Sequence, residues 1–202
     1  MLYPLAMKLN RLHRVYVLEL LASVGACYAG PMVRGSPNPR HWGLPSRLRK
    51  ARKQSGLTRK ALGQKVGRDS EVAANIEAGQ RIPTVGTVAR LASGLGVSAA
   101  WLGFGLGEQN ADGPAATTEG MGARLSAARI EQELTKAALA RLAAISPPAL
   151  ANIENGGQTG IDVIDSLAKA LNVSPAWLAY GVGPQVLPSR RGARAAQTSA
   201  DT

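Results

Sequence analysis

The side chains most able to do chemistry in this 202-residue chain are cationic, and they are unevenly distributed. Lysine and arginine number 24 against 13 aspartate and glutamate, which gives a formal net charge of +11. Residues 40–107 hold 12 cationic and 3 anionic side chains, a net +9, whereas residues 123–183 hold 5 of each. A charge this far from zero indicates a polyanionic partner, either nucleic acid or an anionic membrane surface.

Residues suited to nucleophilic or metal chemistry are few. Cys27 is the single cysteine, and His13 and His41 both precede residue 46. One cysteine excludes a disulfide framework and cannot complete a set of metal ligands. No glycine-rich phosphate loop follows a predicted strand. We therefore expect no enzyme activity, no cofactor and no metal.

The stretch of sequence that must position the cationic side chains occurs twice in the chain. When residues 46–79 are shifted by 77 positions, 13 of 34 residues are identical, and a shift of 76 matches 10 of the 26 residues in 82–107. The octapeptide AWLGFGLG at 100–107 returns as AWLAYGVG at 176–183. Internal repetition at a fixed spacing indicates a duplicated structural unit.

Each repeat is predicted to be all helical. Apolar residues recur with helical spacing, and no stretch alternates with the period of two that is typical of strands. In the first repeat the predicted helices span residues 46–54, 58–66, 69–78, 84–95 and 98–104. Side chains that can cap the first turn of a helix stand at several predicted starts: Thr58, Asp69, Ser98, Thr135 and Ser146.

The predicted fold class is all-α, with two tandem five-helix bundles joined by a flexible linker. A bundle of about 60 residues has a small core, so we expect Trp101 and Trp177 to anchor the last helix of each bundle. The boundaries divide the chain into five parts: an N-terminal extension (1–39), a basic first repeat (40–107), a linker (108–122), a neutral second repeat (123–183) and a disordered basic tail (184–202).

The N-terminal extension differs from the rest of the chain and leaves three alternatives open. It can be an over-long start upstream of Met32, a segment for export or anchoring, or an extra helix packed on the body. Glu19 interrupts its apolar run, which is too short to span a bilayer. A membrane partner is therefore not expected.

Two stretches carry a resemblance to a known family. LTRKALGQKVGRDSEVAANIEAG and LTKAALARLAAISPPALANIENG, followed by LGVSAAWL and LNVSPAWL, resemble the Cro/phage-repressor-type (XRE) helix-turn-helix family. The resemblance covers residues 46–107 and 123–183. It implies that the second helix of each repeat crosses the DNA backbone and that the third lies in the major groove, usually in a dimer.

Each repeat departs from the family pattern at one position. Arg68 stands where the family places an apolar residue at the turn, although Ile145 obeys the pattern. Ala144 stands where the family places glycine, although Gly67 obeys it. The resemblance also implies a partly buried ion pair in each repeat: Arg52 with Glu77, and Arg129 with Glu154.

The resemblance assigns DNA contacts to the first helix, the start of the second helix, and the exposed face and end of the third. Arginine can pair with guanine or hold a phosphate, and asparagine can pair with adenine. In the first repeat these positions are Arg47, Arg49, Lys50, Lys53, Thr58, Arg59, Lys60, Ser70, Glu71, Ala74, Asn75, Gln80 and Arg81.

The same positions in the second repeat are less suited to base recognition. Proline offers no side-chain donor or acceptor, and the second repeat has no net positive charge. We expect this repeat to dimerise or to assist the first on DNA. The positions are Thr135, Lys136, Pro147, Pro148, Ala151 and Asn152.

The sequence favours a sequence-specific DNA-binding transcriptional regulator, expected to be a repressor. Its expected partners are double-stranded DNA, with a homodimer or a protein partner through the second repeat as alternatives. We expect a cytoplasmic protein of a bacterium or phage. The competing hypothesis is a protein-interaction module, an antiactivator or an antitoxin, that has the fold but little ability to read bases.

Overall fold

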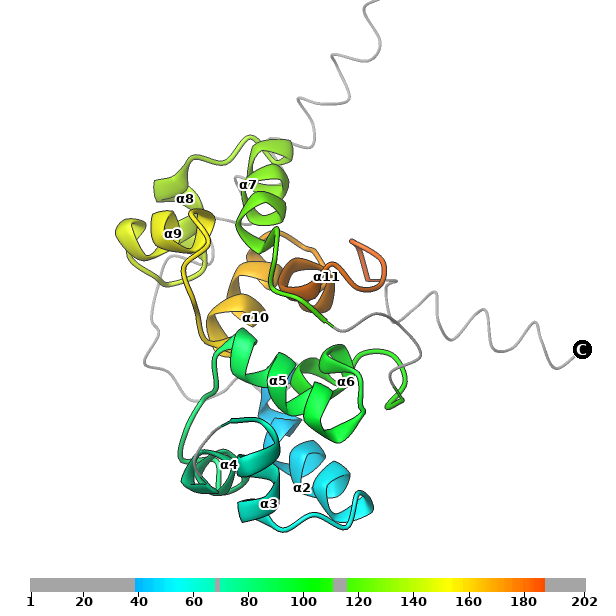
Figure 1. Ribbon diagram of the computed structural model, residues 1–202. Coiled ribbons are helices and arrows are strands. Elements are labelled where there is room, and N and C mark those ends of the chain that lie inside the picture. The colour runs from blue at the N-terminus through cyan, green and yellow to red at the C-terminus, as the bar shows by residue number, and fades with distance from the viewer. Residues whose placement is uncertain (1–38, 68–69, 111–115, 188–202) are drawn as a thin grey trace, which may run out of the picture. The chain divides into compact units, whose positions relative to one another are not determined.

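A computed structural model describes residues 39–67, 70–110 and 116–187, and the elements in these ranges are helices (Figure 1). The first repeat contains the 3₁₀ helix η1 (Arg40–Gly43) and then α2 (Leu44–Gln54), α3 (Arg59–Lys65), α4 (Ser70–Glu77), α5 (Val85–Leu95) and α6 (Ala99–Phe104). The second contains α7 (Met121–Glu131), α8 (Lys136–Leu142), α9 (Pro147–Glu154), α10 (Ile161–Ala170) and α11 (Pro175–Tyr180). The predicted all-α fold is confirmed.

Hydroxyl caps fix the starts of the helices as the sequence predicts. The Oγ1 atoms of Thr58 and Thr135 each accept the backbone amide three residues on, at 3.1 Å. The Oγ atoms of Ser98 and Ser146 accept equivalent amides at 3.4 and 3.3 Å. Each cap satisfies one of the amides left free in a first helical turn. The predicted cap Asp69 lies outside the described residues.

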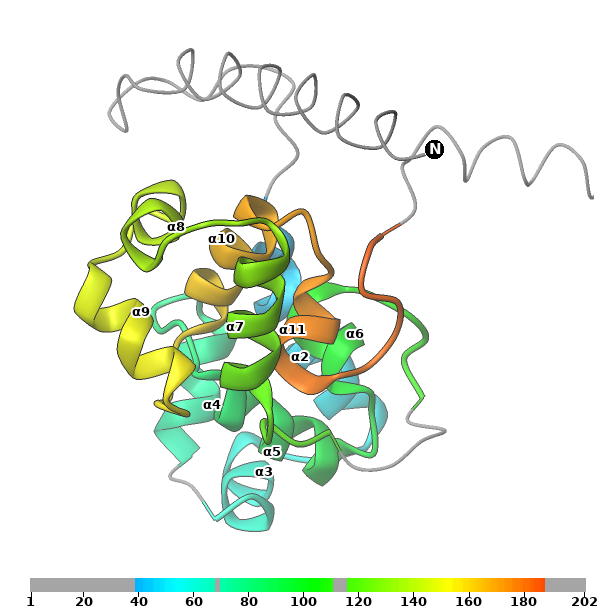
Figure 2. The same cartoon turned by 90° about the horizontal axis from the view of Figure 1, so that it is seen from above.

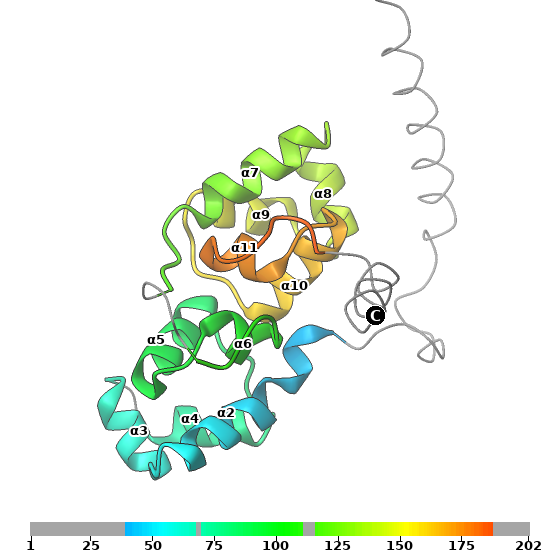
Figure 3. The same cartoon turned by 90° about the vertical axis from the view of Figure 1, so that its right-hand side faces the viewer.

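Equivalent apolar residues form the core of each repeat. In the first repeat α2 packs beside α4 (Figure 3), and in the second α7 packs beside α9 and α11 (Figure 2). The buried side chains of the first repeat have direct counterparts in the second: Leu48 and Leu125, Leu62 and Leu139, Ile76 and Ile153, and Leu102 and Leu178.

The tryptophans do not sit at the centre of these cores. Trp101 and Trp177 are only partly buried at the edge of the core. The leucines beside them, Leu102 and Leu178, are 0% exposed. One face of the Trp101 ring carries Lys50, whose Nζ lies 5.9 Å from the ring centroid. The octapeptide thus buries its leucine completely and packs its tryptophan against the edge of the core.

The two repeats contact one another within one compact unit. Helix α6 packs against α11, and Thr84 forms an isolated antiparallel bridge with Gly160. The sequence predicts two separate bundles, because each repeat has apolar residues enough for a core of its own. The apolar residues at the ends of α6 and α11 pack across the repeats as well, and the sequence pattern did not distinguish these two uses.

The predicted linker is partly ordered. Asn110 forms an isolated bridge with Val97, Ala116 packs against the core, and α7 begins at Met121, inside the predicted linker. Met121 and Gly122 are buried, which explains the early start of the helix. Residues 111–115, the N-terminal extension up to residue 38 and the tail from residue 188 lie outside the described residues, together with the predictions made for them.

Candidate nucleic-acid interface

In each repeat the second and third helices form a closely packed pair. Helix α3 packs against α4 and α8 against α9, and small buried residues, Gly63 on α3 and Ala140 on α8, stand at equivalent positions in the two repeats. Leu62 and Leu139 beside them are fully buried. A small residue at a buried helix position lets a neighbouring helix approach closely.

The turn between the two helices uses a left-handed residue in both repeats. Gly67 has φ 63°, and Ala144 at the equivalent position has φ 55°. Left-handed backbone suits glycine, whereas the Cβ of an alanine costs roughly 1–2 kcal/mol there. The departure from the family pattern at Ala144 therefore changes the residue while the shape of the turn is kept. Arg68, the other departure, lies outside the described residues.

A buried carboxylate ties the first three helices of the first repeat together. The side chain of Glu77, at the end of α4, is 0% exposed. Arg52 Nε donates to its Oε1 at 2.5 Å, and Arg52 Nη2 and Arg59 Nε donate to its Oε2 at 3.1 and 3.0 Å. Arg52 Nη1 also donates to the carbonyl of Leu57 at 2.8 Å. Charged hydrogen bonds of this kind fix the position of α4 against α2 and α3.

Burial raises the pKa of the Glu77 carboxyl, but the hydrogen bonds from Arg52 and Arg59 outweigh it. The net pKa is lowered below its ordinary value of 4.5, so the carboxylate stays charged at neutral pH.

The second repeat builds the same cluster with one change of residue. Arg129 Nε donates to Glu154 Oε1 at 2.7 Å, and Arg129 Nη1 donates to the carbonyl of Leu134 at 2.9 Å. Lys136 Nζ lies 2.9 Å from Glu154 Oε2 and takes the place of Arg59. The ion pair implied by the resemblance thus forms in each repeat. In each repeat the carboxylate also contacts a second cation, at the start of the second helix.

The cations at the start of the second helices remain accessible. The side chains of Arg59 and Lys136 are 50% and 51% exposed although each contacts a buried carboxylate. A guanidinium has five N–H donors and an ammonium has three. Among the described residues only one nitrogen of Arg59 is engaged in this way, so donors on both cations are left for an acceptor outside the repeat.

The chain shows two matches to a known family. Residues 48–102 and residues 125–178 each match the family described as Helix-turn-helix, of the Cro/phage-repressor (XRE) type. The chain belongs to this family. The expectation of two tandem helix-turn-helix copies is confirmed, and the family supports a DNA-binding regulator in general terms. Comparison with curated proteins and with solved structures gave no match.

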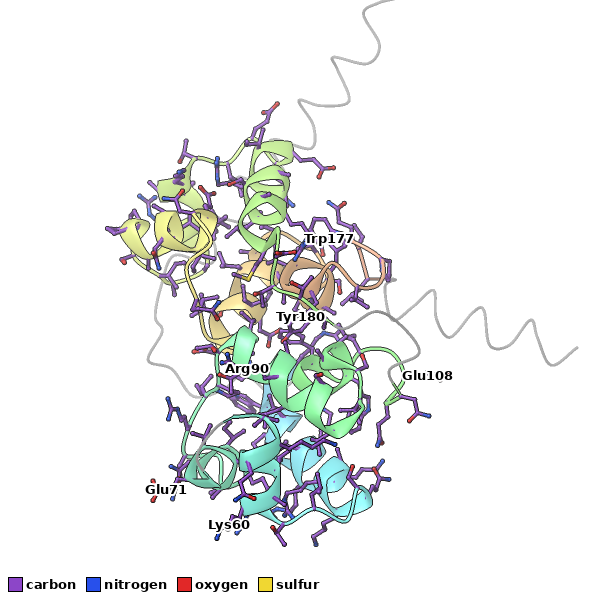
Figure 4. All side chains as sticks on the ribbon, viewed as in Figure 1. Lys60, Glu71, Arg90, Glu108, Trp177 and Tyr180 are labelled. Atoms are coloured by element: carbon purple, nitrogen blue, oxygen red, sulfur yellow. The ribbon has the colours of Figure 1, made fainter. Side chains whose placement is uncertain are left out.

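The first helix-turn-helix exposes several of the residues expected at DNA. Lys60 and Glu71 are exposed on α3 and α4, and Figure 4 shows both side chains at that end of the first repeat. Asn75 is partly buried on α4. Gln80 and Arg81, after α4, are exposed. The remaining expected positions also lie on these elements: Arg49, Lys50 and Lys53 are exposed on α2, Thr58 is the exposed cap of α3, Ala74 is partly buried on α4, and Ser70 begins α4.

The second helix-turn-helix presents a different surface. Pro147 and Pro148 form the exposed first turn of α9, which carries no side-chain donor or acceptor there. Asn152 is exposed, and its Nδ2 would lie 2.3 Å from a Cβ on Gly157, so the amide rests over that glycine. Ala151 is partly buried, while Thr135 caps α8. Helix α9, the counterpart of α4, thus exposes few polar side chains at its N-terminal end.

Arg47, one of the expected DNA contacts, caps the end of α6. Its Nε and Nη2 each donate at 2.8 Å, to the carbonyls of Leu102 and Gly103 at the end of α6. Arg124 makes the equivalent bonds to Leu178 and to the next residue, at 3.1 and 3.0 Å. Burial lowers the pKa of both guanidiniums.

The position of Arg47 follows from the free carbonyls at a helix end, which attract a cationic donor. The identity of Arg47 and Arg124 in the two repeats was the available sign of a structural role.

No helix in the described part of the chain is both long and apolar enough to span a bilayer. Within residues 39–67, 70–110 and 116–187, no group of three or more His, Cys, Asp and Glu could hold a metal ion.

Proposed function

We propose that this chain is a sequence-specific DNA-binding regulator that represses transcription, with α4 of the first helix-turn-helix in the major groove. The second helix-turn-helix gives auxiliary contact. We place the protein in the cytoplasm of a bacterium, encoded by the bacterium or by a phage. Family membership supports the general function, and the remaining statements rest on the surfaces of the two repeats.

The charge difference between the repeats carries this proposal. Residues 40–107 have a net charge of +9, and residues 123–183 have none. Exposed cations of the first repeat lie on α2, on α3 and after α4, and Arg40 on η1 and Arg90 on α5 add two more. Each phosphate that such a cation neutralises releases counterions, and this supplies most of the sequence-independent affinity of DNA-binding proteins.

A salt series with the full chain tests the proposal. We expect binding to random duplex DNA that weakens with salt, with a slope of about 0.9 in log affinity on log salt per phosphate contacted. Lys60→Ala should lower the slope by about that amount and weaken all sequences alike. Lys169→Ala, an exposed lysine on α10, is the matched control and should leave the slope unchanged.

Base recognition is tested separately. Enrichment from a random duplex pool should give a preferred sequence, and Asn75→Ala should relax that preference, since a good base contact contributes ~1–3 kcal/mol. Enrichment that yields no preferred sequence would refute base reading by α4.

The second candidate function is a protein-interaction module, an antiactivator or an antitoxin. The observation that favours it is the exposed Pro147–Pro148 turn, which presents an apolar surface where a base-reading helix would have polar groups. This function predicts no binding of duplex DNA beyond weak association at low salt, and the same salt series separates the two.

A further inference from the structure

The contact between the two repeats uses the same positions on both sides. Val85 N donates to the Thr159 carbonyl at 3.0 Å, and Ile161 N donates to the Pro83 carbonyl at 3.1 Å. In the 76-residue shift, Val85 corresponds to Ile161 and Pro83 to Thr159. The two hydrogen bonds therefore exchange donor and acceptor between equivalent residues. Such reciprocity is the signature of a two-fold, isologous interface.

Equivalent aromatic residues extend this interface. Phe104 ends α6 and Tyr180 ends α11, and their ring centroids lie 6.3 Å apart at an interplanar angle of 50°. Both residues are buried. The Tyr180 hydroxyl also donates to the carbonyl of Val85 at 3.1 Å, so this side chain of α11 reaches α5 of the other repeat (Figure 4).

The residues at the start of each repeat lie near the fourth main helix of the other repeat. His41 Nδ1 lies 3.0 Å from Asp165 Oδ2, which joins η1 to α10. The equivalent positions are Thr118 and Ala89, and these two residues line one cavity. The backbone hydrogen bonds and the aromatic pair thus obey one two-fold relation between the repeats, and the residues equivalent to His41 and Asp165 line one cavity.

We propose that one copy of the chain is an intramolecular dimer that binds a single DNA site, with α4 and α9 over two unlike half-sites. This inference rests on the proposed function. In helix-turn-helix dimers, two-fold symmetry places the recognition helices on half-sites about one helical turn apart. Here the two-fold surface is already buried between repeats of one chain, so it is not available for a second copy.

The two half-sites receive different contacts. Arg59 and Lys136 occupy equivalent, half-exposed positions on buried carboxylates, so both repeats offer one cation to the phosphate backbone. Base-reading groups are unequal, because α9 begins with two prolines where α4 has Ser70 and Glu71. The preferred DNA sequence is therefore non-palindromic, with strong base preference in one half and phosphate contact in both.

The first experiment measures symmetry and stoichiometry on the same DNA. The full chain is used to enrich sequences from a random pool of duplexes long enough for two half-sites, about 30 base pairs. The enriched duplex is then shifted in a gel by a mixture of the chain and a larger carrier-protein fusion of it. We expect a non-palindromic sequence and two shifted bands. A palindromic sequence with a third, intermediate band would show two chains per site and overturn the inference, although DNA binding would stand.

Matched variants test the contact by the second repeat. Lys136→Ala should weaken binding several-fold on all sequences and lower the salt slope by about 0.9, as Arg59→Ala should on the other side. Asn75→Ala should relax base preference in one half only, and Asn152→Ala should leave preference unchanged. Thermal unfolding of each variant establishes that it is folded.

Two results would contradict the inference in different ways. If Lys136→Ala is folded and leaves affinity and slope unchanged while Arg59→Ala lowers both, the second repeat does not reach DNA and the intramolecular dimer fails alone. If no duplex is enriched and random duplex does not bind at low salt, the proposed function fails and the inference fails with it.

Discussion

Replacing the buried Glu77 by glutamine should destabilise the first repeat by about 3 kcal/mol. The side chain is 0% exposed and accepts three charged hydrogen bonds, two from Arg52 and one from Arg59. Breaking a buried ion pair costs ~3–5 kcal/mol, because the remaining charge is left without a partner. Arg52 is 12% exposed and is that remaining charge. Glutamine keeps one carbonyl acceptor, which places the expected loss at the lower end of the range.

Urea unfolding followed by helical circular dichroism measures this loss, and Glu71→Gln is the matched control. Glu71 lies on the same helix but is exposed, so its neutralisation should change the free energy of unfolding by less than ~0.5 kcal/mol. Equal effects of the two substitutions, or a Glu77→Gln loss below about 1 kcal/mol, would show that the buried pair does not hold α4 in place.

Acid should reproduce part of this effect. The pKa of Glu77 is lowered in the folded chain from an ordinary value of 4.5, because hydrogen bonds from Arg52 and Arg59 outweigh the effect of burial. The folded state thus binds its proton less readily than the unfolded state. The stabilisation is present above the ordinary value and is lost as pH falls through the lowered pKa. In Glu77→Gln the free energy of unfolding should therefore fall less steeply below about pH 4.5.

Five further substitutions follow from other contacts. Ala144→Gly should stabilise the second repeat by ~1 kcal/mol in urea, and Gly67→Ala should destabilise the first by a similar amount, because both residues have positive φ. Tyr180→Phe should cost ~0.5–1.5 kcal/mol in thermal unfolding through loss of a buried hydrogen bond. Arg47→Ala should lower stability but leave the salt slope of DNA binding unchanged, since its donors cap α6. Trp101→Ala should lower the unfolding temperature of both repeats together, because α6 packs on α11; proteolysis that leaves an intact second repeat would contradict this.

Local chemistry made much of the fold predictable from the sequence. Thr58 and Thr135 mark helix starts because a hydroxyl beside free amides has one favourable use. The Arg52–Glu77 pair was found from the resemblance, since its partners lie 25 residues apart and no local pattern joins them. The cations of the first repeat could be counted from the sequence, but the capping role of Arg47 could not be told apart from the expected role in DNA contact.

The contact between the repeats could not be predicted in the same way. Phe104 and Tyr180 stand at equivalent positions inside the repeated octapeptide, and a buried aromatic residue fits a small bundle core as well as an interface. The size of the neighbouring tryptophan favoured it as the anchor of the last helix, but the fully buried residue beside it is a leucine. The amide of Val85 donates to the carbonyl of Thr159 in the other repeat. A backbone hydrogen bond of this kind does not depend on the side chains, so the sequence does not reveal it.

The joining of both halves of a two-fold interface in one chain has a consequence for how its residues can change. In an assembly of identical subunits, every substitution enters the interface twice, and an ion pair must be acquired in duplicate or not at all. Here His41 and Asp165 form a pair on one side, while Thr118 and Ala89 occupy the equivalent positions on the other. A substitution on one side therefore leaves the equivalent residue on the other side unchanged. In a symmetric assembly the same substitution would change both sides of the interface.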